Sequence, residues 1–251
     1  MYQDLHAHSY YSFCGQDNPK DVVEAAYRGG LDVIGLSDHN YGIGYGRLDA
    51  LNSKSAADLH TTYERTLRRY YDHIQLLKEA YRGKIRVLSG IEVCTLSGPR
   101  FPVQSLPDSE DISFFDFCLL EALDSDESLM KGDLFSYTKR CRTPLVGVAH
   151  TDMFAFLQKI GADPLSYFRK MADSGIFWEM NVNYDSTHGY RQHAYVKEFF
   201  SHPGQQEIVR KSGVLVSVGF DGHKVADYRP DILKDYCQKL EELEIPMPFS
   251  K

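Results

Sequence analysis

A chain of 251 residues, 43% hydrophobic and 25% charged, has the composition of an ordinary globular protein, so we expect one domain over residues 1–251. A net charge of -7 argues against a nucleic-acid groove, which needs clustered Lys and Arg to neutralise phosphates. No stretch approaches the roughly 18 apolar residues of a membrane span, and no signal pattern opens the sequence, so we expect a cytoplasmic protein.

In chain order, short apolar runs rich in Val, Ile, Leu or Phe predict seven strands, at 3–8, 32–37, 85–92, 114–120, 145–150, 176–182 and 214–220. Stretches with helical spacing lie between them, at 19–30, 55–82, 126–141, 163–174, 203–212 and 230–244. This alternation predicts parallel strands joined by right-handed crossovers. Because the strands are almost wholly apolar, both faces of the sheet should be covered, and seven units favour an incomplete α/β barrel.

Polar side chains stand at the ends of five of these strands, at His6 and His8, Asp38 and His39, Glu92, His150, and Asp221 and His223. The carboxyl ends of the strands meet at one face of a parallel barrel, so we expect these side chains to converge. His6 and His8 are two apart on a strand and can chelate one ion. Imidazoles suit Zn, Mn and Fe, and carboxylates can bridge two ions, so the set predicts more than one metal.

Each of these residues also has a purely structural explanation when it is taken singly. One of the histidines in His6-x-His8 could be a hydrogen-bonded core residue, and Asp38 could cap a helix with His39 beside it by chance. Glu92 and His150 could each be structural. The strand-end position that all five clusters share is what favours a functional site.

The order of the motifs resembles that of the polymerase-and-histidinol-phosphatase (PHP) family over nearly the whole chain. The motifs are Asp4-Leu-His-Ala-His-Ser9, Gly35-Leu-Ser-Asp-His39, Gly90-Ile-Glu92, Val148-Ala-His150, Glu179-Met-Asn181 and Gly219-Phe-Asp-Gly-His223. The resemblance implies a distorted (β/α)7 TIM-like barrel of the PHP type with two or three divalent ions, Zn, Mn or Fe. It also implies hydrolysis of a small phosphorylated substrate by metal-activated water.

The resemblance further implies a ligand set. The first ion would be held by His6, His8, Glu92 and Asp221. The second would share Glu92 and add His150, and the third would use His39 and His223. Glu92, Asp221 and His150 would be the catalytic residues.

Two positions depart from the family pattern. Many members carry an acid or a histidine where this chain has Cys14, which is either a soft ligand of the third ion or a neutral gap. Zinc tolerates a thiolate better than manganese does. The fourth strand of relatives usually ends in a histidine, and we expect Leu123 to take that place, with Glu121 or Asp124 as possible substitutes.

Two loops at this end of the barrel offer arginines for a phosphate group. The loop 183–193 contains Arg191, and the glycine- and tyrosine-rich loop 41–47 ends in Arg47. An arginine can pair with phosphate through its fork of donors. Arg100 and Arg229 are rivals for this role, and the loop 41–47 is either a lid or a plain connection.

Two other functions remain open at the level of sequence. An amidohydrolase-type enzyme that cleaves C–N bonds also begins with His-x-His, but it usually has a lysine at a middle strand and a lone final Asp. Glu92 and the Asp221-x-His223 pair therefore favour the phosphoesterase. A catalytically degenerate metal-binding protein is the third possibility, which the missing fourth-strand histidine supports.

Overall fold

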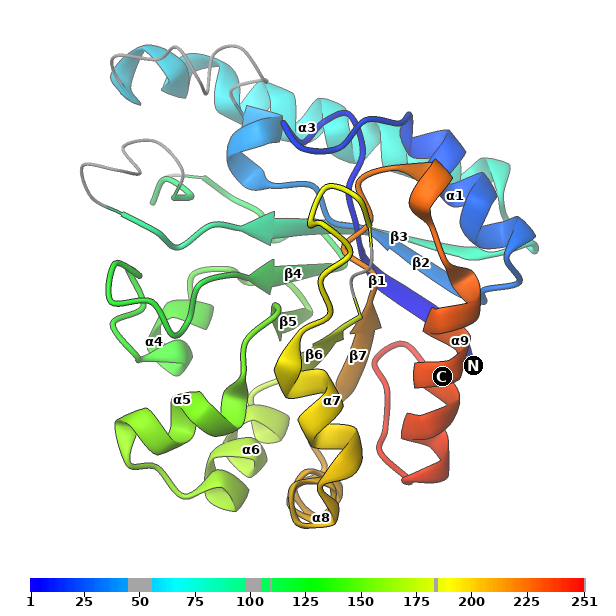
Figure 1. Ribbon diagram of the computed structural model, residues 1–251. Coiled ribbons are helices and arrows are strands. Elements are labelled where there is room, and N and C mark those ends of the chain that lie inside the picture. The colour runs from blue at the N-terminus through cyan, green and yellow to red at the C-terminus, as the bar shows by residue number, and fades with distance from the viewer. Residues whose placement is uncertain (45–55, 98–104, 109, 183–184, 251) are drawn as a thin grey trace.

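Seven parallel strands lie side by side in chain order, and helices cover them on the outside (Figure 1). The computed structural model describes residues 1–44, 56–97, 105–108, 110–182 and 185–250, with the side chains of 56–65 outside that description. The strands are β1 (Gln3–Ala7), β2 (Val33–Leu36), β3 (Arg86–Val93), β4 (Phe117–Leu120), β5 (Leu145–Val148), β6 (Ile176–Asn181) and β7 (Val216–Gly219). All seven predicted strands are present, with ends that differ from the predicted ones by a few residues.

The helices that follow these strands are mostly those that the sequence predicts. They are α1 (Pro19–Arg28), α3 (Ala56–Ala80), α4 (Leu134–Thr138), α5 (Met153–Ile160), α6 (Pro164–Asp173), α7 (Ala194–Ser201), α8 (Pro203–Ser212) and α9 (Pro230–Glu242). The cap of α1 is typical, because the Asn18 side chain accepts from the backbone N–H of Lys20 and Pro19 occupies the first position. None of the helices in the described ranges combines the length and apolar character needed to span a membrane.

The predicted helix 126–141 is wrong over its first half. Lys131 and Gly132 have φ angles of 49° and 78°, in the left-handed region that a helix excludes, and Asp133 then caps the short α4. The helical spacing did not predict α5 and α7. Each has only eight residues, too few for its spacing to stand out between neighbouring elements.

Backbone and carboxylate hydrogen bonds join β1 to β7 and so close the sheet into a barrel. The N–H of Asp221 donates to the carbonyl of His6 at 2.6 Å, and that of His8 donates to Gly222 at 2.9 Å. At the same junction of β1 and β7, one oxygen of the buried Asp4 carboxylate accepts hydrogen bonds from the backbone N–H groups of His6 and Phe220. The predicted seven-unit, TIM-like α/β barrel is confirmed.

A small apolar cluster fills the barrel below the strand ends and includes Leu5, Leu119, Phe117 and Phe177. The ring of Phe117 fits because two neighbouring strands carry glycine opposite it. A Cβ at Gly35 or Gly90 would lie 2.7 or 2.3 Å from its Cζ atom. Phe117 therefore supports the floor on which the polar strand ends rest.

Replacing Phe117 with Ala is expected to lower the free energy of unfolding by about 3–5 kcal/mol, because a fully buried aromatic ring is lost and its cavity cannot collapse between two glycine-bearing strands. Denaturant titration followed by circular dichroism measures the change. Leu76→Ala is the control, since that side chain is 69% exposed and its loss should change stability by less than about 0.5 kcal/mol. Equal stability of the two variants would contradict the packing assigned to Phe117.

Candidate metal centre

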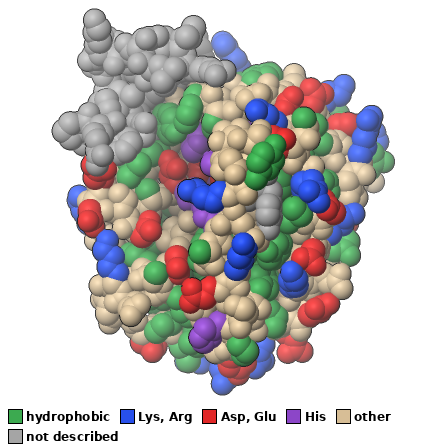
Figure 2. Space-filling model, in the orientation of Figure 1, with side chains coloured by type: hydrophobic (Ala, Val, Ile, Leu, Met, Phe, Trp, Pro, Cys, Tyr) green, Lys and Arg blue, Asp and Glu red, His purple; other side chains and the backbone are tan. Residues whose placement is uncertain are grey.

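Most of the predicted strand-end residues lie in or beside one cavity of about 260 Å³. Five of these strand-end residues line it, His39, Glu92, His150, Asp221 and His223, together with Arg191. Tyr41, Glu121, His188 and His193 complete the wall. Figure 2 shows histidine, acidic and basic side chains meeting in a hollow near the middle of one face of the molecule. The cavity is therefore almost entirely lined by groups that can carry charge or bind a metal.

His6 lies on β1 and His8 directly follows that strand. Both histidines meet two carboxylates at the bottom of the cavity. The Nε2 atoms of His6 and His8 are 3.1 Å apart. His8 Nε2 is also 3.1 Å from Oδ1 of Asp221, and His6 Nε2 is 3.4 Å from Oε1 of Glu92. All four side chains are buried. Ring nitrogens and carboxylate oxygens aimed at one point are the arrangement that a single divalent ion requires.

A second group lies on the other side of Glu92. His150 Nε2 is 3.1 Å from Oε1 of Glu92, and Glu121 brings a carboxylate oxygen within 4.8 Å of both. The expectation that Leu123 takes the fourth-strand position is wrong. Because β4 ends at Leu120, Glu121 is the first residue beyond it, whereas Leu123 and Asp124 line a separate surface depression.

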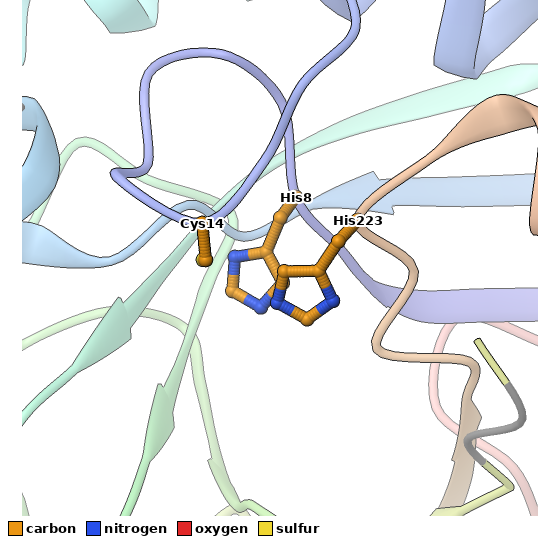
Figure 3. A group of neighbouring side chains, drawn as sticks. All are labelled: His8, Cys14 and His223. Carbon is orange, nitrogen blue, oxygen red and sulfur yellow. The ribbon is translucent and has the colours of Figure 1, made fainter. Parts of the chain in front are cut away.

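A third group forms where the loops after β1 and β7 approach each other. Cys14, His8 and His223 point into a common space in Figure 3, and their ligand atoms lie within 4.8 Å of one another. The Nδ1 atom of His39 reaches Glu92 Oε2 at 2.9 Å and so connects this group to the other two. Cys14 is half-buried, and its thiol hydrogen-bonds with His223 and His39.

The electrostatics of the cluster favour added positive charge. Burial lowers the pKa of His150 and His223, but Glu92 beside the first and Asp185 beside the second raise these pKa values to about 9 and about 10. Burial raises the pKa of Glu92, yet His39 and His6 bring it well below its ordinary value. Protons on these histidines balance the negative charge of the carboxylates. Divalent cations bound in the cluster can balance the same charge.

Two buried atoms support the same conclusion by their geometry. Nδ1 of His39 and Oε2 of Glu92 are 2.9 Å apart as an ion pair, yet in a geometry that does not complete a regular hydrogen bond. Buried polar atoms with incomplete hydrogen bonding are uncommon and call for an explanation. An ion bound by both atoms would satisfy them, and the nitrogen, oxygen and sulfur donors nearby fit zinc, manganese or iron.

The backbone is strained at two of these strand ends. His150 and Asp221 have φ angles of 27° and 54°, in a region that residues other than glycine rarely adopt. Such strain costs about 1–3 kcal/mol and persists where surrounding contacts enforce it. Here the N–H of His150 is held by the carboxylate of Glu179, and that of Asp221 by the carbonyl of His6.

Two carboxylates lie beneath the histidines, and the sequence pattern did not predict a functional role for either of them. Glu179 Oε1 is 2.7 Å from His6 Nδ1, and Asp185 Oδ2 is 3.0 Å from His223 Nδ1. Carboxylates placed in this way orient the rings of metal-binding histidines. The motif Glu179-Met-Asn181 was a signal for the first, whereas nothing in the sequence marks Asp185.

Asp38 has a different place from the other strand-end residues. Its carboxylate accepts from the backbone N–H groups of Ser9 and Ser12 and from the Ser9 hydroxyl. It therefore fixes the loop that carries Cys14 and does not face the cavity. Its neighbour His39 does face the cavity.

The rim of the cavity contains one of the two arginines predicted to bind phosphate. Arg191 lines it, together with His193, whose ring stacks on that of His150 with centroids 6.2 Å apart. Arg47 lies outside the described residues. The role of Arg191 toward a phosphate group stays a prediction.

Comparison with known proteins agrees with this architecture. The structure of histidinol phosphate phosphatase from Lactococcus lactis, complexed with zinc, L-histidinol and phosphate, is 17% identical over 98% of this chain and 95% of its own, with a TM-score of 0.55. The HisK protein of Listeria monocytogenes is 16% identical over 90% of this chain and 96% of its own, with a TM-score of 0.46. At 17% identity, the likeness to the first of these structures concerns the fold alone.

A search of curated proteins found no match to the sequence. The family model described as the PHP domain, in contrast, matches residues 4–243, which include every predicted ligand from His6 to His223. This match covers almost the entire chain and agrees with the resemblance that the motifs predict. The chain belongs to the PHP domain family.

Proposed function

We propose that this protein is a metal-dependent hydrolase of phosphate esters that acts on small phosphorylated molecules. The observation that carries the proposal is the convergence of histidine, cysteine and carboxylate groups around one buried glutamate, Glu92, in a PHP-domain barrel. The cavity volume of about 260 Å³ suits a small substrate. The similar fold of a zinc-containing histidinol phosphate phosphatase supports the same reaction class.

The proposed centre holds two to three divalent ions. The first ion position is formed by His6, His8, Glu92 and Asp221, and the second by Glu92, Glu121 and His150. The third position combines Cys14 and His223, whose ligand atoms lie within 4.8 Å of each other, with the ring of His39, which helps to lower the pKa of the Cys14 thiol. Glu92 contributes to the first and second positions because its Oε1 atom lies 3.4 Å from Nε2 of His6 and 3.1 Å from Nε2 of His150.

Divalent ions in such a centre activate a water molecule and neutralise charge that develops on a phosphoryl group. Glu92 and Asp221 keep the ligands together, since each carboxylate faces at least two of the histidines. Arg191 stands on the cavity wall, where its fork of donors can bind two phosphate oxygens and orient the ester. We assign it that role and propose Glu92, Asp221 and His150 as the catalytic residues.

A substrate screen tests the proposal against its two alternatives. Protein purified without chelators and loaded with Zn or Mn is offered a chromogenic phosphate ester, a panel of phosphorylated metabolites and a panel of amides and amines. Release of inorganic phosphate is the expected result. Turnover confined to the amide panel would instead support the amidohydrolase, and bound metal with no turnover would support a degenerate metal-binding protein.

Cys14 is expected to be protected from thiol reagents in the metal-loaded protein and to become reactive after chelation. Burial raises the pKa of its thiol, but hydrogen bonds with His223 and His39 bring that pKa below the ordinary value, so the freed group is a good nucleophile. Labelling is read at Cys14 by peptide mass spectrometry. Equal labelling in both states, with unchanged metal content in Cys14→Ala, would remove Cys14 from the ligand set.

A further inference from the structure

A single buried carboxylate connects two of the proposed ion positions from below. Glu179 stands on β6 and is 1% exposed. Its Oε1 atom is 2.7 Å from Nδ1 of His6, and its Oε2 atom accepts a hydrogen bond from the backbone N–H of His150 at 2.7 Å. His6 belongs to the first proposed ion position and His150 to the second.

The surrounding backbone is shaped to hold this carboxylate in place. A Cβ atom on Gly219 of the neighbouring strand would lie 2.1 Å from Glu179 Oε1 and 2.6 Å from the Cβ of His6, so only glycine leaves room for the contact. The hydroxyl of Tyr195 donates to the carbonyl of Glu179 and accepts from the N–H of Asn181, each at 2.9 Å. These contacts fix the position of Glu179 on β6.

The contact with His6 sets the protonation pattern of its ring. A carboxylate beside Nδ1 favours the proton on that nitrogen and leaves the lone pair on Nε2. That Nε2 atom faces His8 and Glu92, at 3.1 Å and 3.4 Å. Glu179 thus turns His6 into a ligand for the first ion.

The contact with His150 acts through the backbone. The φ angle of His150 is 27°, which an unconstrained histidine avoids. The hydrogen bond from its N–H to Glu179 holds this conformation, and the ring then places Nε2 at 3.1 Å from Glu92 Oε1. The same carboxylate therefore positions a ligand of the second ion.

We propose that Glu179 is a positioning residue that couples the two ion positions, so that its loss weakens both ions together. This inference rests on the proposed metal centre. It adds that the affinities of the first and second ions are linked through one carboxylate that contacts neither ion.

The decisive variant is Glu179→Gln, which keeps the size of the side chain but has a single acceptor oxygen for two donors. Its NH2 group must face either His6 Nδ1 or the N–H of His150, so one contact is lost and the other loses the negative charge that strengthens it. We expect both ions to bind about 10- to 100-fold more weakly, as is common when an orienting carboxylate is removed. Titration of the folded variant with Zn in the presence of a competing chelator measures each affinity.

Asp116→Asn is the matched control. This carboxylate, placed just before β4, accepts hydrogen bonds from Ser89 and Lys78 and makes no contact with the proposed ligands. The control should lose stability without losing metal affinity, because the same chemical change is made away from the centre. Wild-type affinity in Glu179→Gln, or weakening of only one of the two ions, would overturn the coupling.

Two further measurements separate positioning from simple stabilisation. The Nδ1 proton of His6 should give a slowly exchanging downfield NMR signal in the metal-free wild type, and this signal should move upfield or disappear in Glu179→Gln, because an amide oxygen is a weaker acceptor than a carboxylate. Glu179→Asp keeps both acceptor oxygens and should recover part of the lost affinity. It also replaces the Gln variant if that protein does not fold, and wild-type affinity for both ions in Glu179→Asp would then overturn the inference. A wild-type protein that binds no metal would contradict the proposed function itself.

Discussion

Replacing Asp221 with Asn, or Glu92 with Gln, is expected to lower kcat for phosphate-ester hydrolysis by more than about 100-fold. Each amide has nearly the shape of the carboxylate but no negative charge. Asp221 faces His8 at 3.1 Å, and Glu92 faces His39 and His150 at 2.9 Å and 3.1 Å. Without either charge the histidines lose the partner with which they would hold an ion, so the ion and the water that it activates are lost together.

The measurement is kcat with the best phosphate ester of the screen, combined with elemental analysis of the same samples. Asp126→Asn provides the control, because its side chain is 93% exposed and pairs with Lys159 at the surface. It should retain normal turnover and metal content. Near-normal turnover in both Asp221→Asn and Glu92→Gln would place the chemistry elsewhere in the protein.

The sequence was sufficient to predict the barrel and the proposed ligands because both depend on local patterns. Apolar runs mark the strands, and a polar residue directly after such a run lies at the carboxyl end of the barrel wherever the strands are parallel. His6, Glu92, His150 and Asp221 all follow this rule, and the structure brings them together. The order of the motifs then supplied the family, which the match over residues 4–243 confirms.

The features that the sequence could not show depend on how distant strands are aligned. Asp4 pairs with Ile34 and Ala7 pairs with Leu36, so β1 advances three residues where β2 advances two. The additional residue forms a bulge in β1 at the histidine motif. Nothing in the local sequence marks this extra residue. The bulge allows Leu5 to join the apolar cluster while the next residue, His6, faces the metal centre.

The same reason explains the errors at the fourth strand and the missed carboxylates. Placing Glu121 at the centre required knowing that β4 ends at Leu120, a boundary that is obscured because apolar residues resume at Ala122 and Leu123. Glu179 and Asp185 act on histidines from other strands or loops, at sequence separations of 29 to 173 residues. Their roles follow from the barrel geometry and not from spacing along the chain.

Replacing both His6 and His8 with Ala is expected to remove at least two metal ions per chain, since His6 and His8 supply the ring nitrogens of the first position and His8 also borders the third. Without these rings the first position keeps only the carboxylates of Glu92 and Asp221, and the third loses one of the rings beside it. Elemental analysis of protein from metal-supplemented medium gives the ion count.

Thermal unfolding provides an independent readout of the same change. Bound ions stabilise the folded wild type in proportion to the logarithm of their concentration, by about 2.7 kcal/mol at 100 times Kd. Tm of the wild type should therefore rise with added Zn, whereas Tm of the double variant should not. His202→Ala is the control, because His202 caps α8 at the surface and its loss leaves the centre intact. Fewer than one ion per wild-type chain, or a double variant that keeps its ions and its response to Zn, would contradict a centre built on His6 and His8.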